Sequence, residues 1–251
     1  MTKEHLRELI QFSNDEKLIL NAFKTLTNRK FNSSITVFCP CRSITGLDCL
    51  DRSGNANNMT LTGASLVSAF GGKGLIFDNI DDQASITDAA SFNNIFNAGG
   101  TMIWQMRLNV ISDNDGIFRK SAAMSVWIDA PSGGAVKLLL QITFSGNTPR
   151  WSTATQVLKP HKKYTCAISY DGSSTANDPV FAINGKIYKT SDGTLNETLV
   201  PSGTITNDSG SDLIINNVLA DRADMYFRNL MILDRVCTEA QLKLLTGGDV
   251  F

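Results

Sequence analysis

Histidine is scarce in this chain, and its scarcity restricts the chemistry that the protein can perform. Among 251 residues there are two histidines, His5 and His161, which leave little material for a histidine-rich metal site or a nucleophile–histidine pair. The five cysteines are an odd number, so internal disulfides cannot use them all. The 23 basic and 24 acidic residues leave a net charge of −1, which argues against a chain that coats nucleic acid.

Long apolar runs are also missing. The N-terminal segment lacks the basic start, the unbroken apolar stretch and the small-residue cleavage site of a secretory signal. No window of the sequence approaches the roughly 20 apolar residues that span a bilayer. We therefore expect no membrane insertion, and we expect a protein that folds in the reducing cytoplasm with its cysteines free.

Residues 1–33 carry helical signals. Ser13 and Glu16 fit a capping box, and apolar residues recur at helical spacing around it, at Leu6, Leu9, Ile10, Leu18, Ile19 and Phe23. Helices of this length are marginal alone and need a surface to pack against. The pattern predicts a helical N-terminal arm that attaches the protein to an assembly or joins its copies in a homo-oligomer.

From residue 34 to residue 251 the dominant period is two, which is typical of antiparallel strands with one buried face. The alternation of apolar and polar residues is clear in four segments, 102–110, 136–144, 164–170 and 225–233. In the last segment the alternation places four apolar residues on one side, Met225, Phe227, Met231 and Leu233. Many short strands of this kind predict an all-β sandwich or jelly roll.

Two local signals fix shorter elements. Asn184-Gly185 lies between the strand-like segments 180–183 and 186–188 and predicts a tight hairpin. Near the C-terminus, Thr238 and Gln241 fit a capping box, which predicts a short helix over residues 239–245.

The order of six segments resembles laminin G-like domains of the concanavalin A-like lectin and glucanase superfamily. The matching segments are 51–58 (DRSGNANN), 74–82 (GLIFDNIDD), 103–104 (IW), 164–172, 180–185 (VFAING) and 227–242. Tyr164 stands where the family has tryptophan, and Asn79 stands where it has glycine. The resemblance implies a jelly-roll sandwich of two antiparallel sheets over residues 34–251, with the arm of residues 1–33 outside the family pattern.

The resemblance alone does not give a function, because the family includes both binding domains and glycan hydrolases. Related glucanases carry Glu-x-Asp-x-x-Glu on one strand, and hydrolysis needs two carboxylates that flank the scissile bond. No such spacing exists here, and the glutamates number only five, Glu4, Glu8, Glu16, Glu197 and Glu239. We therefore expect no enzyme activity, with a nonstandard aspartate pair as the remaining route to a hydrolase.

The tryptophans provide the candidate binding surface. Trp104 shares the apolar side of its strand, but Trp127 lies with the polar residues Ser125 and Asp129, where an indole can stack on a sugar ring or anchor a protein. The alternative is a tryptophan covered by a loop or by the arm. The polar faces of other strands and a second tryptophan between polar residues complete the set: Gln105, Arg107, Lys137, Gln141 and Trp151.

Metal ligands are a weaker signal. Cys39, Cys41 and Cys49 are close enough in sequence for a zinc site, although buried free thiols explain them better. Two acidic turns offer oxygen ligands for calcium, with Asp81 and Asp82 in one and Asp113 and Asp115 in the other. Asx turns explain both without a metal, so we expect no cofactor and treat calcium as the alternative.

Laminin G-like domains are common in the tail and head-surface proteins of bacteriophages, and the resemblance therefore implies a phage virion as the setting. We expect a non-enzymatic structural or adhesion component of the virion, assembled in the host cytoplasm. Its expected partners are other virion proteins, copies of itself and a cell-surface glycan. The alternatives are a free carbohydrate-binding lectin and a glycan hydrolase.

Overall fold

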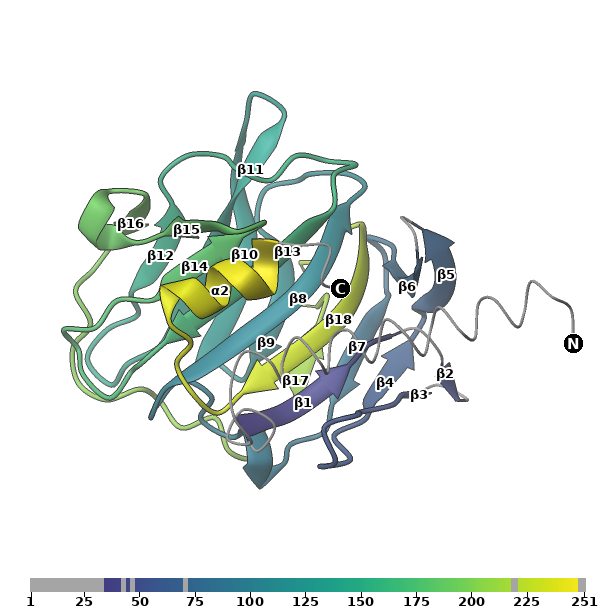
Figure 1. The fold of residues 1–251 in the computed structure, drawn as a ribbon, viewed down its shortest axis with the longest axis horizontal. Helices are drawn as coiled ribbons and strands as arrows, with labels where there is room; N and C mark the ends of the chain where they lie inside the picture. The colour runs from purple at the N-terminus through teal and green to yellow at the C-terminus, as the bar shows by residue number, and fades with distance from the viewer. Residues whose placement is uncertain (1–33, 42–43, 46–47, 70–71, 218–220, 248–251) are drawn as a thin grey trace, which may run out of the picture.

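Two antiparallel sheets stack face to face, as Figure 1 shows. The computed structural model describes residues 34–41, 44–45, 48–69, 72–217 and 221–247. The eight-stranded sheet contains, in spatial order, β15 (Lys186–Tyr188), β14 (Val180–Ile183), β13 (Tyr164–Tyr170), β8 (Gly100–Leu108), β18 (Met225–Leu233), β6 (Gly72–Phe77) and β5 (Ser65–Ala69), and β1 (Ile35–Cys39) also pairs with β18.

The second sheet has ten strands in the described part of the chain. Its order is β16 (Leu195–Glu197), β12 (Arg150–Thr153), β11 (Ala135–Ile142), β10 (Met124–Ser132), β9 (Asp115–Lys120), β17 (Leu213–Ile215), β7 (Gln83–Ile86), β4 (Met59–Thr62), β3 (Asp48–Cys49) and β2 (Ile44–Thr45). Two short 3-10 turns, η2 (Ala90–Phe92) and η3 (Thr190–Asp192), lie in the connections. The predicted two-sheet sandwich is confirmed.

The core between the sheets follows the alternation of the sequence. On β8 the side chains of Met102, Trp104, Met106 and Leu108 all point into this core. Trp104 packs edge-on against Phe118 of the opposite sheet at 5.0 Å between ring centroids, and Phe118 packs against Phe227 at 5.8 Å. Period-two patterning therefore identified the buried face correctly on these strands.

A β-bulge corrects the prediction for β18. Met225 and Phe227 point into the core as expected, but the pairing register shifts after Arg228, and Asn229 has a φ of 56°. The extra residue turns the strand over, so Leu230 and Ile232 enter the core instead of Met231 and Leu233. The prediction that all four apolar residues share one side is wrong because strict alternation does not anticipate a bulge.

The two short elements form as predicted. Asn184 and Gly185 have φ values of 47° and 78°, the left-handed pair that a type I′ turn requires between β14 and β15. At the helix α2 (Glu239–Gly247), the amide of Gln241 donates to Thr238 Oγ1 at 3.3 Å. The amide of Thr238 in turn donates to Gln241 Oε1 at 2.9 Å, which completes the capping box.

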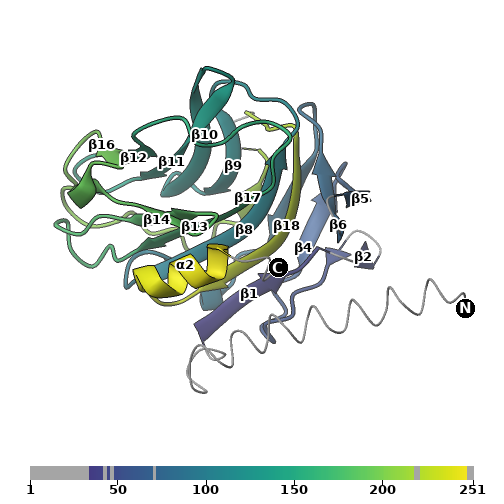
Figure 2. The same cartoon turned by 45° about the horizontal axis from the view of Figure 1, so that its top comes forward.

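Helix α2 covers the outer face of the eight-stranded sheet. Leu242 and Leu245 pack in one cluster with Ile103, Ala167 and Met231 of that sheet. Figure 2 shows α2 on one side of the sandwich and β9 to β12 in the other layer. The outer face of the ten-stranded sheet therefore lies on the opposite side of the molecule from the helix.

The segment that opens the resemblance acts as a structural clamp. The carboxylate of Asp51 accepts hydrogen bonds from the backbone amides of Phe38, Ser53 and Asn57, at 2.8 to 2.9 Å. The side-chain amide of Asn57 donates to the carbonyl of Thr36 at 2.7 Å. These bonds hold the loop after β3 against β1, which explains the residue types without a ligand.

The predicted arm of residues 1–33 lies outside the described residues, and so do its six apolar positions. In the part of the chain that the structure describes, no helix is both long and apolar enough to cross a membrane.

Candidate functional site

Trp127 lies on the outer face of the ten-stranded sheet, as the alternation predicted. Its neighbours Val126 and Ile128 are fully buried in the core, whereas Trp127 is half-buried. The indole Nε1 donates to Ser125 Oγ at 2.7 Å, two residues back on the same strand and on the same face. This bond ties the indole to its own strand, and the half-buried ring keeps part of its surface open to solvent.

Strand register identifies the neighbours of Trp127. Leu139 is its cross-strand partner on β11, points to the same face and is only 7% exposed. On β9, β10, β11 and β12, every second residue likewise points to this outer face. We call this set the Trp127 face: Arg119, Ser125, Trp127, Asp129, Lys137, Leu139, Gln141, Arg150 and Ser152.

Hydrogen bonds hold the two arginines of the Trp127 face close to the sheet. Arg150 is exposed, and its Nε donates to Gln141 Oε1 at 2.7 Å. Arg119 is half-buried, and its Nε donates to the carbonyl of Ser121 at 3.0 Å. Each guanidinium keeps its remaining N–H donors for another acceptor, because these bonds use only one of five.

Two carboxyl groups meet at one end of the Trp127 face. The backbone amide of Ala130 donates to Asp113 Oδ1 at 3.0 Å and also to the carboxylate of Asp129. Burial, together with a hydrogen bond between the two carboxyl groups, raises the pKa of Asp129. Burial and the shared hydrogen bond therefore make the carboxyl group of Asp129 easier to protonate than a free aspartate.

Gln105 and Arg107 do not belong to this surface, and that part of the prediction is wrong. Both lie on β8 in the eight-stranded sheet, while Trp127 lies in the other sheet. Gln105 is 2% exposed, and its Oε1 accepts from Arg228 Nε at 2.6 Å and from Asn229 Nδ2 at 2.9 Å beside the bulge. The period of a strand shows which residues share a face but not which sheet the strand joins.

Trp151 is also misplaced in the prediction, because its side chain is fully buried. The ring packs against Tyr170 at 5.4 Å between centroids, and Nε1 donates to Asp178 Oδ1 at 3.1 Å. The polar neighbours suggested exposure, but they alternate with Trp151 on β12 and point outward themselves. The same alternation places Arg150 on the Trp127 face, and the register of β9 adds Arg119.

The two acidic turns predicted as calcium candidates differ in how close their carboxylates lie. Asp81 and Asp82 come together with Asp78, with carboxylate oxygens within 4.8 Å of one another. The carboxylate of Asp78 accepts the backbone amide of Ile80 at 2.9 Å, which is the Asx turn of the alternative explanation.

The second acidic turn does not gather its carboxylates. Asp113 lies beside Asp129, whereas Asp115 is 5% exposed and accepts the amide of Ser112 at 3.1 Å. Burial raises the pKa of Asp115 to about 6, and the nearby Asp221 and Asp113 add to the increase. Among the described residues, this turn therefore offers no cluster of three carboxylates like that of Asp78, Asp81 and Asp82.

The prediction of buried free thiols is confirmed for all five cysteines. The thiols of Cys39 and Cys41 hydrogen-bond to Cys49 and lower its pKa to about 5. The three sulfurs are not all within 4.8 Å of one another, since the aspartate trio is the one group of that kind among the described residues.

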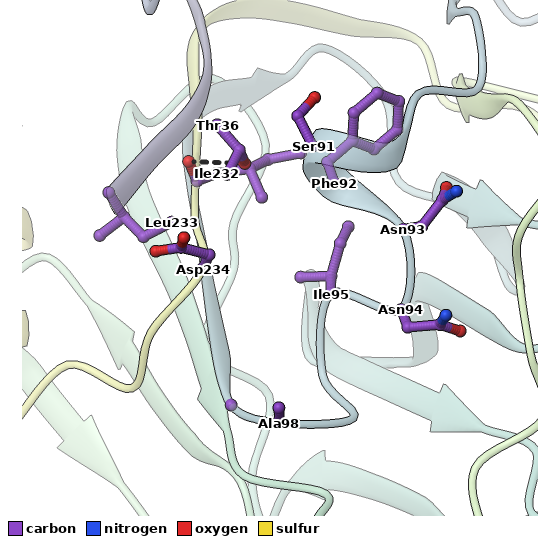
Figure 3. Close-up of a pocket in the computed structure, with 11 residues that line it drawn as sticks. Thr36, Ser91, Phe92, Asn93, Asn94, Ile95, Ala98, Ile232, Leu233 and Asp234 are labelled. Carbon is purple, nitrogen blue, oxygen red and sulfur yellow. Dashed lines mark hydrogen bonds between the residues drawn. The ribbon is translucent and has the colours of Figure 1, made fainter. Parts of the chain in front are cut away.

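A small hollow lies between the loop that contains η2 and the end of β18, and Figure 3 shows its lining. Ile95 lies in the space between the two segments, while the amides of Asn93 and Asn94 point to the other side of the loop. The volume of about 130 Å³ is well below the several hundred Å³ of most small-molecule sites. The broad Trp127 face is therefore the stronger candidate for ligand contact.

No family model and no curated protein sequence matches this chain. Solved structures match in fold at low identity. The binding domain of Paraclostridial Mosquitocidal Protein 1 superposes with a TM-score of 0.66 at 13% identity, over 85% of this chain and 52% of that one. The binding domain of botulinum neurotoxin DC, solved with rat synaptotagmin II, superposes with a TM-score of 0.63 at 15% identity, over 85% of this chain and 51% of that one.

A third match has a different context. Domain 4 of AbnA, a GH43 extracellular arabinanase from Geobacillus stearothermophilus solved with arabinotriose, gives a TM-score of 0.56 at 15% identity, over 84% of this chain and 98% of that one. The chain spans about half the length of the two toxin binding domains. These likenesses define a lectin-like jelly-roll β-sandwich.

Proposed function

We propose that the protein is a non-enzymatic binding module whose Trp127 face contacts a glycan. The observation that carries the proposal is the indole of Trp127, which Ser125 holds along the outer face of a sheet among charged and amide side chains. A flat aromatic ring stacks on the apolar face of a sugar, while neighbouring polar groups bond its hydroxyls. The fold likeness to binding domains of toxins and to a domain solved with arabinotriose supports this choice.

The arrangement of carboxylates favours binding over hydrolysis. The aspartate pair on the Trp127 face, Asp113 and Asp129, is joined by a hydrogen bond. The two carboxyl groups of a retaining glycosidase lie about 5 to 5.5 Å apart and those of an inverting enzyme lie farther apart, because the scissile bond passes between them. A directly bonded pair leaves no room for that bond.

We further propose that the module is a structural or adhesion component of a bacteriophage virion, attached through residues 1–33. The support for this setting is the resemblance of segments such as 51–58 and 74–82 to laminin G-like domains. Purified phage particles from a producing host should contain the chain, and a variant without residues 1–30 should fail to enter the particle while it keeps glycan binding. A chain that never copurifies with particles would instead favour a free lectin.

A glycan array followed by calorimetry on the full chain tests the binding site. Trp127→Ala should abolish the signal while the protein stays folded, with at most a modest fall in melting temperature, because the side chain is half-buried and lies outside the core between the sheets. Ile80→Ala is the matched control, since Ile80 is 74% exposed on a turn outside the Trp127 face. Equal binding by wild type and Trp127→Ala would remove the indole from the site, and a signal lost in Ile80→Ala would relocate it.

A further inference from the structure

We infer that the ligand of the Trp127 face is an acidic saccharide, whose ring stacks on Trp127 and whose carboxylate or sulfate is held by Arg119, Lys137 and Arg150. The inference rests on the proposed function, because it names the ligand class of the same surface. The juxtaposition of one indole and three cations on one sheet face is the observation behind it.

The cations occupy both sides of the indole. Ser125 pairs with Arg119 on β9 and with Gln141 on β11, and Gln141 pairs with Arg150 on β12. Neighbouring strands lie about 4.8 Å apart, so the three steps from β9 to β12 place the two arginine backbones roughly 14 Å apart. That span accommodates about two to three sugar units, with Trp127 next to the middle of the row.

Lys137 supplies the third positive charge. It lies opposite Asp129 and two residues from Leu139, the cross-strand partner of Trp127. Among the described residues, no ion pair or side-chain hydrogen bond engages Lys137. Its ammonium is therefore available to an external anion.

The cations outnumber the acidic groups on this surface. Arg119, Lys137 and Arg150 share the face with two carboxyl groups, Asp113 and Asp129, which both accept the amide of Ala130 at one end of it. The chain as a whole carries a net charge of −1, so a local excess of positive charge around its most prominent outward indole is a specific feature of this surface. Guanidinium groups form charge-assisted, often bidentate bonds with carboxylates and sulfates.

The experiment compares paired ligands by calorimetry with the full chain. One pair is sialyllactose and lactose, and the other is a heparin-derived tetrasaccharide and its desulfated form. In at least one pair the acidic member should bind 10-fold or more tightly, and its affinity should fall steeply with added NaCl, as expected for exposed charges. Arg119→Gln, Lys137→Gln and Arg150→Gln should each weaken acidic binding by roughly 3- to 10-fold, since a bond to a charged group contributes about 1 kcal/mol or more.

Lys162→Gln is the matched control, because Lys162 is an exposed lysine in the basic turn around His161. The Lys162→Gln variant should bind the acidic member of each pair as tightly as wild type. A loss of affinity in this variant would place the anion at the turn around His161 and overturn the inference. Equal binding of acidic and neutral members, lost in Trp127→Ala, would overturn the inference and leave the proposed function intact. Binding to no saccharide at all would overturn both.

Discussion

The buried ammonium of Lys120 lies 3.1 Å from the Oδ1 atoms of both Asp88 and Asp208. Lys120 is at the end of β9 and has no exposed side-chain surface. Its Nζ also donates to Asn93 Oδ1 and to the carbonyl of Ser211, each at 2.9 Å. One side chain thus ties two loops, residues 88–93 and 208–211, to the end of an interior strand of the ten-stranded sheet.

Removal of this ammonium should destabilise the protein strongly. Lys120→Met leaves the aspartates without their cation, and breaking a buried pair from one side costs about 3 to 5 kcal/mol. Urea unfolding of both proteins measures the free energy of unfolding. The control is Lys189→Met, which breaks the part-exposed pair with Glu239 at 2.8 Å and should cost far less, because solvent screens exposed charges. Similar losses in the two variants would show that the Lys120 network contributes little.

Gly185 should not tolerate a side chain. It has a φ of 78°, and a Cβ atom there would lie 2.8 Å from the Cα of Gly247 at the end of α2. Gly185→Ala should therefore lower the free energy of unfolding by roughly 1 kcal/mol through left-handed backbone strain and by a further 1 to 3 kcal/mol through overpacking. Gly133→Ala is the control, because Gly133 has a φ of 59° with nothing within 4 Å of the added atom. Equal losses in thermal unfolding would mean that the helix moves aside without cost.

Asp115 should make the fold less stable as the pH rises. Its folded pKa of about 6, raised mainly by burial, lies above the unfolded value of about 3.9. The folded state therefore binds the proton more tightly, and the stabilisation is complete below pH about 4 and is lost as the pH passes about 6. A shift of two pKa units changes the free energy of unfolding by roughly 3 kcal/mol.

Asp115→Asn removes this titration while it keeps an oxygen for the amide of Ser112. Relative to wild type, the variant should gain up to about 3 kcal/mol between pH about 4 and about 6.5, measured by urea unfolding. Asp192→Asn is the control of opposite sign, because hydrogen bonds from Thr194 lower the pKa of Asp192. Its loss of stability relative to wild type should be complete above pH about 4 and should fade as the pH drops below that value. A constant difference between wild type and Asp115→Asn would refute the prediction.

Calcium should leave the protein unchanged if the module needs no cofactor. We expect the same melting temperature and the same glycan affinity in millimolar CaCl₂ and in EDTA. A calcium-dependent increase in melting temperature that is absent in Asp81→Asn would identify the trio of Asp78, Asp81 and Asp82 as a metal site. Asp221→Asn, a change at an exposed aspartate outside the trio, provides the comparison.

The sequence by itself determined the local elements. Alternation identified the buried faces of β8 and β13, Asn184-Gly185 specified a type I′ hairpin, and Thr238 with Gln241 specified the start of α2. These features depend on side chains a few residues apart, so the local pattern contains all the information. The outward position of Trp127 was predictable for the same reason.

Only the tertiary structure decided which strands share a sheet. Gln105 and Trp127 have similar local patterns, yet pairing between distant segments assigns β8 to one sheet and β10 to the other. At the bulge in β18, the left-handed residue Asn229 reverses which side chains of the following residues point into the core. Trp151 is fully buried although its sequence neighbours are polar. Arg119 and Arg150 joined Trp127 only through cross-strand register, because the packing of whole sheets, rather than local periodicity, brings such residues together.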